Sequence, residues 1–379
     1  MILAVDVETS RKPAHLPWMP GSYLTSIAVV SDCGVSGCFL FKHNESNGLG
    51  ERQQVEELQL MINKATVIIA HNMKFDLHWL RWIGLNLEDT PIYCTMVAEY
   101  LIRGQQCGAL SLDNLASHYG LSCKDDIDWD IPTHEQPLQQ LMAYNIQDAN
   151  LALSIALKQR TLIIEAGMGR LVRQQNEQIH CLTDIESTGL RVNKEVRDGL
   201  ESDYRSKLRS CEEDIKRIAG SEFNIGSGTQ LSCALFGGSF SYTGREQYSI
   251  ILKSGESRRR ERNAQFTTTL AGMGFIPDPS TTLAKPGYWS TAVPILQGLY
   301  PQAKRGTPHR KILDLLITRS ALSQVISTYL DGINKHIIDG AVHPNMNQTI
   351  TATGRLSCSR PNLQNQPDDV KGMFLPVDL

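Results

Sequence analysis

Several features of other protein classes are missing from this sequence. No apolar run approaches the roughly 18 residues that a membrane-spanning helix needs. The N-terminus lacks the basic segment that opens a secretory signal, and a carboxylate already stands at Asp6. The nine cysteines include no CxxC pair, and their odd number in a long chain favours reduced thiols. Together these absences predict a cytoplasmic protein.

The chain has 379 residues, more than one hydrophobic core usually supports, so two or three domains are expected. Its charge is unevenly distributed. Residues 1–165 hold 11 Lys and Arg against 19 Asp and Glu, whereas residues 166–379 hold 26 against 21. An acidic front half suits a site for divalent cations, and a mildly basic rear half suits a polyanionic partner.

The front half alternates short β-rich runs with helical stretches. The runs predicted as strands are bounded by turn residues and cover 2–7, 25–30, 38–41 and 67–70. The stretches predicted as helices cover 51–63, 73–83, 111–120 and 138–157. This interleaving predicts an α/β fold, with a mixed sheet and flanking helices.

The rear half has a different pattern. Apolar residues at spacings of three and four predict helices over 170–186, 196–218 and 312–330, the second capped by Asn193. Residues 237–310 are rich in Gly, Ser, Thr, Arg and Pro, without a clear period, and are predicted to be irregular or partly β. From His343 onward a strand-like pattern returns. The rear half therefore predicts a mainly helical region with a partial sheet at its end.

Three short motifs in the front half carry acidic side chains. Asp6 and Glu8 end the opening strand, where alternation places both on one face. Asp76 falls in the first turn of the helix after the run VIIA. Tyr144 and Asp148 are four residues apart on the long helix, so the phenol and the carboxylate share a face. Each motif alone has an ordinary alternative: exposed acids on a strand, a charge at a helix N-terminus, or a surface Tyr–Asp pair.

In this order, the motifs DxE, NxxFD and YxxxD resemble those of the DEDDy exonuclease superfamily. This superfamily includes the proofreading domains of A-family DNA polymerases, with ribonuclease D as a cousin. The resemblance covers residues 1–165 and implies a ribonuclease-H-like fold and 3′–5′ exonuclease activity. The catalytic residues that it implies are Asp6, Glu8, Asp76, Tyr144 and Asp148. Asn72 and Phe75 are expected to line the pocket for the terminal nucleotide.

The expected chemistry explains these residue types. Hydrolysis of a phosphodiester needs a nucleophilic water in line with a leaving 3′-oxygen whose charge is neutralised, and two divalent ions about 3.5–4 Å apart provide both. Carboxylate oxygens suit Mg²⁺ or Mn²⁺. The resemblance implies that Asp6, Glu8 and Asp148 bind the ion that carries the water, and that Asp6 and Asp76 bind the second ion. Tyr144 is expected to orient the water, because its phenol is too weakly acidic to be needed as a base at neutral pH.

A second resemblance lies near the end of the chain. Residues 347–367 read NQTITATGRLSCSRPNLQNQP, which closely resembles the segment TxTGRLSSxxPNLQNIP at the start of the palm of A-family polymerases. It implies that Arg355 tests the minor groove of the primer–template, where purine N3 and pyrimidine O2 acceptors occur in every correct pair. Asn362, Gln364 and Asn365 are expected to contact the duplex nearby.

The sequence therefore predicts a 3′–5′ exonuclease domain over 1–165, a polymerase thumb over 166–340 and the beginning of a palm over 341–379. The expected function is proofreading during DNA replication, with single-stranded 3′ ends and primer–template duplex DNA as partners. The layout resembles phage polymerases, which implies the cytoplasm of a bacterial host. The alternatives are a non-catalytic DNA-binding subunit and a standalone ribonuclease D-like exoribonuclease. The intact acids disfavour the first alternative, and the TGRLS segment disfavours the second.

The remaining polymerase motifs of the family do not occur before Leu379. No fingers helix and no palm aspartate motif is present, so this chain alone is not expected to polymerise DNA. We therefore expect a second polypeptide that carries the rest of the palm and the fingers.

Residues 244–288 look like an insertion in the thumb and contain Arg258, Arg259, Arg260 and Arg262. One expectation is a solvated basic loop. The other is a segment that lies along duplex phosphates or docks an accessory factor.

Overall fold

The computed structural model describes residues 1–11, 15–45, 51–104, 108–122, 127–251 and 257–375. The chain forms two compact units. Unit 1 comprises Met1–Val192, His336–Gln366 and Phe374–Leu379, and unit 2 comprises Asn193–Lys335 and Pro367–Met373. Among the described residues, no helix is long and apolar enough to cross a membrane.

Unit 1 is built around a five-stranded sheet in the order β3-β2-β1-β4-β5. The strands are β1 (Ile2–Thr9), β2 (Leu24–Ser31), β3 (Ser36–Leu40), β4 (Val67–Ala70) and β5 (Ile92–Cys94). Strand β1 pairs antiparallel with β2 and parallel with β4, so the predicted mixed sheet is confirmed. The sequence analysis did not predict β5, whose three residues are too few to show a period.

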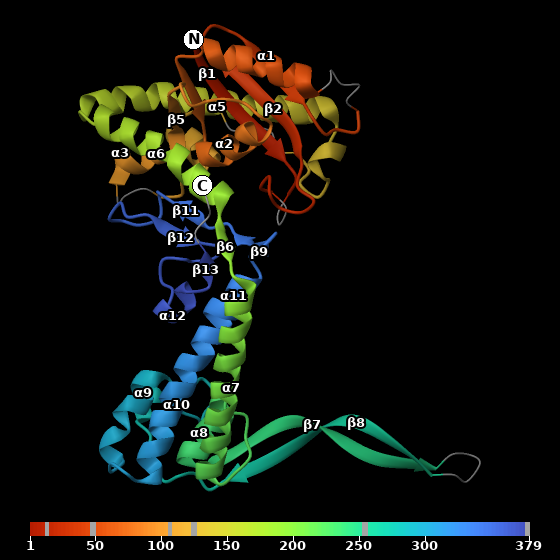
Figure 1. The fold of residues 1–379 in the computed structure, drawn as a ribbon, viewed down its shortest axis with the longest axis vertical. Helices are drawn as coiled ribbons and strands as arrows, with labels where there is room; N and C mark the ends of the chain where they lie inside the picture. Colours follow the sequence, from red (N-terminus) through yellow and green to blue (C-terminus); the bar gives the residue numbers. More distant parts are fainter. Residues whose placement is uncertain (12–14, 46–50, 105–107, 123–126, 252–256, 376–379) are drawn as a thin grey trace. The chain divides into compact units, whose positions relative to one another are not determined.

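Helices cover both faces of this sheet (Figure 1). They are α1 (Glu51–Lys64), α2 (Met73–Trp82), α3 (Thr95–Arg103), α4 (Leu112–His118), α5 (Leu138–Glu165) and α6 (Gly169–Thr188), with a 3₁₀ turn at η2 (Thr133–Glu135). The predicted helices over 51–63, 73–83, 111–120, 138–157 and 170–186 are thus confirmed. Helix α3 was not predicted.

Alternation along β1 decides where its acids lie. Leu3, Val5 and Val7 are buried in the core that includes side chains of α1 and α2. Ala4 points to the other face, where it packs in a core formed largely by small residues of α5. Small side chains let this helix approach the sheet closely. Asp6 and Glu8 continue the same face as Ala4, so they point toward α5.

The rest of unit 1 consists of short strands. A four-stranded sheet in the order β13-β6-β10-β9 contains β6 (Leu190–Val192), β9 (Ile337–Ile338), β10 (Ala341–Val342) and β13 (Phe374–Leu375). Strands β11 (Asn345–Asn347) and β12 (Ser357–Ser359) pair antiparallel. The strand-like pattern expected from His343 onward is therefore only partly confirmed. Residues 348–356 contain no strand, because the chain turns around Gly354, whose φ is +75°.

Unit 2 has a helical core around α7 and α10, which pack side by side (Figure 1). Its helical elements are α7 (Lys194–Ala219), α8 (Gly228–Phe236), η3 (Pro279–Thr281), α9 (Val293–Gly298), η4 (Tyr300–Gln302), α10 (Pro308–Gln324), the π-helical turn η5 (Val325–Leu330), α11 (Asp331–Asn334) and α12 (Asp368–Lys371). The predicted cap at Asn193 is confirmed, since its side chain accepts a hydrogen bond from Val196 N.

A long two-stranded ribbon extends from this core. Strands β7 (Gly238–Ile251) and β8 (Ser257–Leu270) pair antiparallel along their full length. The expectation of an irregular or partly β region over 237–310 is therefore confirmed in its β part, although the length and regularity of the ribbon were not predicted. Most residues on both faces of its strands are polar. The sequence therefore shows little of the alternation of apolar with polar residues that marks a half-buried strand.

Candidate active site

Three carboxylates converge where β1 faces α5. Ligand atoms of Asp6, Glu8 and Asp148 all lie within 4.8 Å of one another. The first two come from alternate positions of β1, and the third comes from the middle of α5. Negative groups this close repel one another unless a cation lies between them. The cluster therefore has the form of a cation site made of oxygen ligands.

A buried amide holds one of these carboxylates in place. Asn145 is fully buried on α5, and its Nδ2 donates to Asp6 Oδ2 at 2.7 Å. Its Oδ1 in turn accepts from Ser26 Oγ on β2 at 3.0 Å. This bridge fixes the orientation of the Asp6 carboxylate and leaves its other oxygen for other partners. The sequence analysis missed Asn145, although it stands inside the YxxxD motif beside Tyr144.

The fourth acid, Asp76, joins the site from α2. It is only 2% exposed, and its Oδ1 accepts from Val7 N at 3.1 Å. The pairing of β1 with β4 ends at Ala4, so the backbone N–H of Val7 is left to bind this carboxylate. Burial raises the pKa of Asp76 well above its usual range, and the negative charges of Asp6 and Glu8 raise it further. A bound cation would oppose this shift.

The start of α2 also places the two predicted pocket residues. Asn72 precedes the helix in the left-handed conformation, with φ of 58°, and Phe75 N donates to its carbonyl at 2.8 Å. Both side chains line a cleft of about 880 Å³ within unit 1. Phe75 is half-buried there and stacks on His15, with ring centroids 6.3 Å apart. Another wall of this cleft comes from His343–Ile350, far along the sequence.

Tyr144 is buried on α5, four residues before Asp148. The edge of Trp129 contacts its ring, with centroids 5.4 Å apart and planes at 83°. The guanidinium of Arg11 lies 5.1 Å from the centroid of Trp129. Trp129, Arg11 and Glu8 line a hollow of about 590 Å³ beside the carboxylates. The ring of Tyr144 is thus packed against Trp129, a residue that lines the same hollow as Glu8.

A second polar cluster supports the cleft wall. Glu186, on α6, is 3% exposed and accepts from Lys74 Nζ at 2.5 Å, His78 Nε2 at 2.8 Å and Met346 N at 2.5 Å. Lys74 Nζ also donates to Asn345 Oδ1 at 2.9 Å. These bonds tie β11 to α2 and α6. The sequence analysis gave Glu186 and Lys74 no role, because their partners are more than 100 residues away.

The predicted palm residues lie apart from the four acids in sequence and are all exposed. Arg355 stands in the turn between β11 and β12, and Thr351 Oγ1 donates to its carbonyl at 2.5 Å. Asn362, Gln364 and Asn365 follow β12 in a loop where Gln364 N donates to Asn362 Oδ1 at 3.0 Å. An exposed position leaves these side chains accessible to a large ligand.

The donor chemistry of the acidic site fits magnesium or manganese. All four side chains offer hard carboxylate oxygens, and Asp6, Glu8 and Asp148 lie close enough to share one ion. The thiol of nearby Cys38 does not add a soft ligand. Burial raises its pKa to about 12, and the charge of Asp6 contributes.

Comparisons with known proteins give the family. A family model described as 3′–5′ exonuclease matches residues 3–163, and a model described as DNA polymerase family A matches residues 263–376. The chain is 29% identical over 308 residues to DNA polymerase I of Chloroflexus aurantiacus, and 25% identical over 409 residues to DNA polymerase DpoZ of Salmonella phage PMBT28. The chain carries a 3′–5′ exonuclease domain and the beginning of a family A DNA polymerase domain.

The chain matches only part of each relative. The Chloroflexus match covers 79% of the chain and 28% of the relative, and the phage match covers 100% and 57%. A solved structure, the POL domain of Pol1 from M. smegmatis in complex with DNA primer-template and dNTP, aligns with a TM-score of 0.63. That alignment covers 98% of the chain and 54% of the solved one, and at 21% identity it shows the fold alone.

Proposed function

We propose that this chain is a metal-dependent exonuclease that removes nucleotides from the 3′ end of DNA. It would act as the proofreading and DNA-holding front part of an A-family polymerase in DNA replication. The observation that carries the proposal is the convergence of Asp6, Glu8 and Asp148 within 4.8 Å, in a domain of the exonuclease family. Asp76 binds the same strand through Val7 N.

The carboxylates divide between two Mg²⁺ or Mn²⁺ sites in this proposal. Asp6, Glu8 and Asp148 would hold one ion, and Asp6 and Asp76 would hold the other. When bound, such a pair supplies a more acidic water and neutralises charge on the leaving oxygen. Asn145 would keep the orientation of the Asp6 carboxylate fixed, through the 2.7 Å bond to Oδ2.

Other residues of the chain position the substrate and the water. The buried phenol of Tyr144 orients the attacking water, and Trp129 holds the ring in place. Phe75 offers an aromatic face on which a terminal base can stack. Asn72 contributes polar contacts from the same edge of the cleft. These roles are positional and need no proton transfer by the chain itself.

The polymerase part of the proposal rests on the family and on exposed residues. Arg355, Asn362, Gln364 and Asn365 would contact the minor-groove side of primer–template DNA. Residues 166–340 would form the thumb and residues 341–379 the start of the palm. Synthesis would require the fingers and the rest of the palm of this family, and the protein would act in the cytoplasm of a bacterial host.

Degradation of a 5′-labelled single-stranded oligonucleotide tests the exonuclease proposal. With Mg²⁺ present, the parental chain should shorten the oligonucleotide stepwise from its 3′ end. Asp6→Ala should slow this by at least about a hundredfold, equivalent to ~2.7 kcal/mol of barrier. Asp89→Ala, which removes an exposed aspartate of the same unit, is the matched control and should retain the parental rate. An Asp6→Ala variant with near-parental activity would show that the site is misassigned.

Two further arms separate the alternatives. Faster degradation of RNA than of DNA would favour a ribonuclease D-like enzyme. A parental chain that binds DNA but does not degrade it in Mg²⁺ or Mn²⁺ would favour the non-catalytic subunit.

A further inference from the structure

The two faces of the β7–β8 ribbon differ in chemistry. Cross-strand partners in an antiparallel pair share a face, so the register assigns every side chain. One face, which we call the Arg–Tyr face, carries Tyr242, Tyr248, Arg258, Arg260, Arg262 and Phe266. The opposite face, the Ser–Thr face, carries mainly Ser, Thr and Gln, with Arg245 and Arg259. At about 3.3 Å per residue, the 14-residue strands make the ribbon roughly 45 Å long.

The polar groups of the Ser–Thr face pair with one another. Ser239 Oγ lies 2.7 Å from Thr269 Oγ1, and Ser241 Oγ lies 3.0 Å from Thr267 Oγ1. Farther out, Arg245 forms an ion pair with Glu261 at 3.2 Å. This face therefore meets much of its own hydrogen-bonding demand, and of its two arginines only Arg259 forms no ion pair with a residue that the structure describes.

On the Arg–Tyr face, most of the arginines lack a charged partner among the described residues. Arg258 and Arg260 form no ion pair with any residue that the structure describes. Arg262 pairs with Glu246 at 2.7 Å and places its guanidinium 5.4 Å from the ring centroid of Tyr248. The three arginines recur at every second position of β8, so they lie about 7 Å apart along one face.

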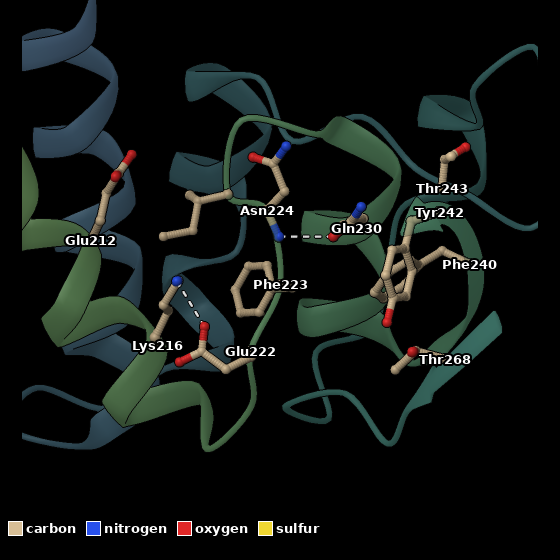
Figure 2. Close-up of a pocket in the computed structure, with 11 residues that line it drawn as sticks. Glu212, Lys216, Glu222, Phe223, Asn224, Gln230, Phe240, Tyr242, Thr243 and Thr268 are labelled. Carbon is tan, nitrogen blue, oxygen red and sulfur yellow. Dashed lines mark hydrogen bonds and ion pairs between the residues drawn. The ribbon is translucent and has the colours of Figure 1, made fainter. Parts of the chain in front are cut away.

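Aromatic rings accompany these arginines. Tyr242 is 42% exposed and stacks on Phe266 across the strands, with centroids 5.7 Å apart and planes at 27°. Tyr248 is 36% exposed and is paired with Arg260 in the register. The face begins at a hollow of about 630 Å³ at the root of the ribbon, where Figure 2 shows Phe240, Tyr242 and Thr268 beside Phe223. Only the root is buried, so the rings farther out are not needed for the core of unit 2.

This combination favours one class of ligand. Unpaired arginines attract phosphates, and exposed aromatic rings stack on bases. A purely acidic partner would match the arginines but would leave the tyrosines exposed. A DNA strand presents a phosphate and a base in each nucleotide, and it matches both kinds of side chain.

We propose that the Arg–Tyr face is a binding site for a DNA strand. Arg258 and Arg260 contact phosphates, and Tyr242 and Tyr248 stack on bases. The site is independent of the exonuclease proposal, because it lies in unit 2. The three arginines also lie between the two ranges that the family models match, 3–163 and 263–376.

Charge-matched variants of the two faces test this site. Arg258→Gln with Arg260→Gln removes two charges from the Arg–Tyr face, and Arg245→Gln with Arg259→Gln removes two from the Ser–Thr face. Binding of fluorescein-labelled single-stranded dT20 and of a blunt 20-base-pair duplex is followed by anisotropy, in EDTA to prevent hydrolysis, from 50 to 200 mM NaCl. Thermal unfolding of each full-length variant verifies that the fold is retained.

The Arg–Tyr variant should raise the Kd for dT20 about tenfold at low salt. Its salt slope should fall by about 1.4 for the single strand, or by about 1.8 for a duplex if a duplex is the ligand. The Ser–Thr variant should change the Kd less than about threefold. Tyr248→Thr should raise the Kd for dT20 about fivefold or more, with the slope unchanged, because a stacked base is lost and no phosphate contact is.

Three results would overturn the proposal or part of it. Parental Kd and slope in the Arg–Tyr variant would exclude a DNA site on this face, and a protein partner would then be the better explanation for it. Equal losses in both double variants would mean that net charge matters and the face does not. Parental binding of dT20 by Tyr248→Thr would exclude base stacking on Tyr248 and would leave phosphate contacts as the only part of the proposal.

Discussion

Replacing Glu186 by Gln would test the polar cluster that holds β11 against α2 and α6. In the parental protein, Oε1 of Glu186 accepts from Lys74 Nζ and Met346 N, and Oε2 accepts from His78 Nε2. Glutamine has one acceptor oxygen, so its NH₂ group must face one set of these donors. The negative charge that neutralises Lys74 is also lost.

The structure sets the size of the effect. The side chains of Glu186 and Lys74 are only 4% and 15% exposed, and removing one partner of a buried ion pair costs about 3–5 kcal/mol. Glutamine keeps one acceptor, and Lys74 still donates to Asn345, so we expect the lower value. At about 2–4 °C per kcal/mol for a unit of this size, about 3 kcal/mol lowers the Tm of unit 1 by roughly 6–12 °C.

A double-mutant cycle with Lys74→Met separates the pair from its surroundings. The double variant should lose at least about 1 kcal/mol less free energy of unfolding than the two single variants lose in sum, because it leaves no unpaired buried charge. Thermal unfolding followed by circular dichroism provides the measurement. Glu177→Gln, which changes an exposed glutamate of the same helix, should shift the Tm little. If the losses of unfolding free energy in the two single variants add up to the loss in the double variant, the coupling is refuted.

The other predictions concern catalysis, the ribbon and pH. Tyr144→Phe should slow exonuclease turnover about tenfold or more, with an unchanged Mg²⁺ requirement; a shifted Mg²⁺ requirement would contradict its water-orienting role. Gly272→Ala should lower the stability of unit 2 by about 3 kcal/mol or more, because its Cβ would lie 2.2 Å from a backbone nitrogen at φ +75°. The control is Gly274→Ala, which has a similar φ but open space around it and should lose less in urea unfolding. Burial and Arg81 lower the pKa of His180, so stability that is present above about pH 6.5 should decline as pH falls. His180→Gln should flatten that decline, and identical Tm–pH profiles would disprove the linkage.

Local signals in the sequence were enough to locate the acids on their elements. Alternation on one strand put Asp6 and Glu8 on a common face, and the end of a buried strand put Asp76 in the first turn of a helix. Helical spacing did the same for Tyr144 and Asp148. Each of these inferences needs only neighbours within a few residues, which is the range over which backbone geometry determines side-chain direction.

Long-range contacts could not be read in this way. Asn145 follows the predicted tyrosine directly, yet its bond to Asp6 spans 139 positions and depends on how closely α5 approaches the sheet. The partners of Glu186 are similarly remote. The bounds and the length of the β7–β8 ribbon were not predicted for a different reason. Most of its residues face solvent on both sides, so burial imposes little alternation of apolar with polar residues on its sequence.

Because unit 1 is discontinuous, it cannot be completed in a single stretch of synthesis. Its first segment ends at Val192, and His336 begins the next one. At about 5–20 residues per second, the ribosome needs roughly 7–30 s to make the intervening unit 2. During that interval Glu186 and Lys74 exist without Met346, so β11 cannot yet dock and part of the cleft wall is missing. A nascent chain should therefore carry an assembled carboxylate site before it has a complete cleft for the DNA end.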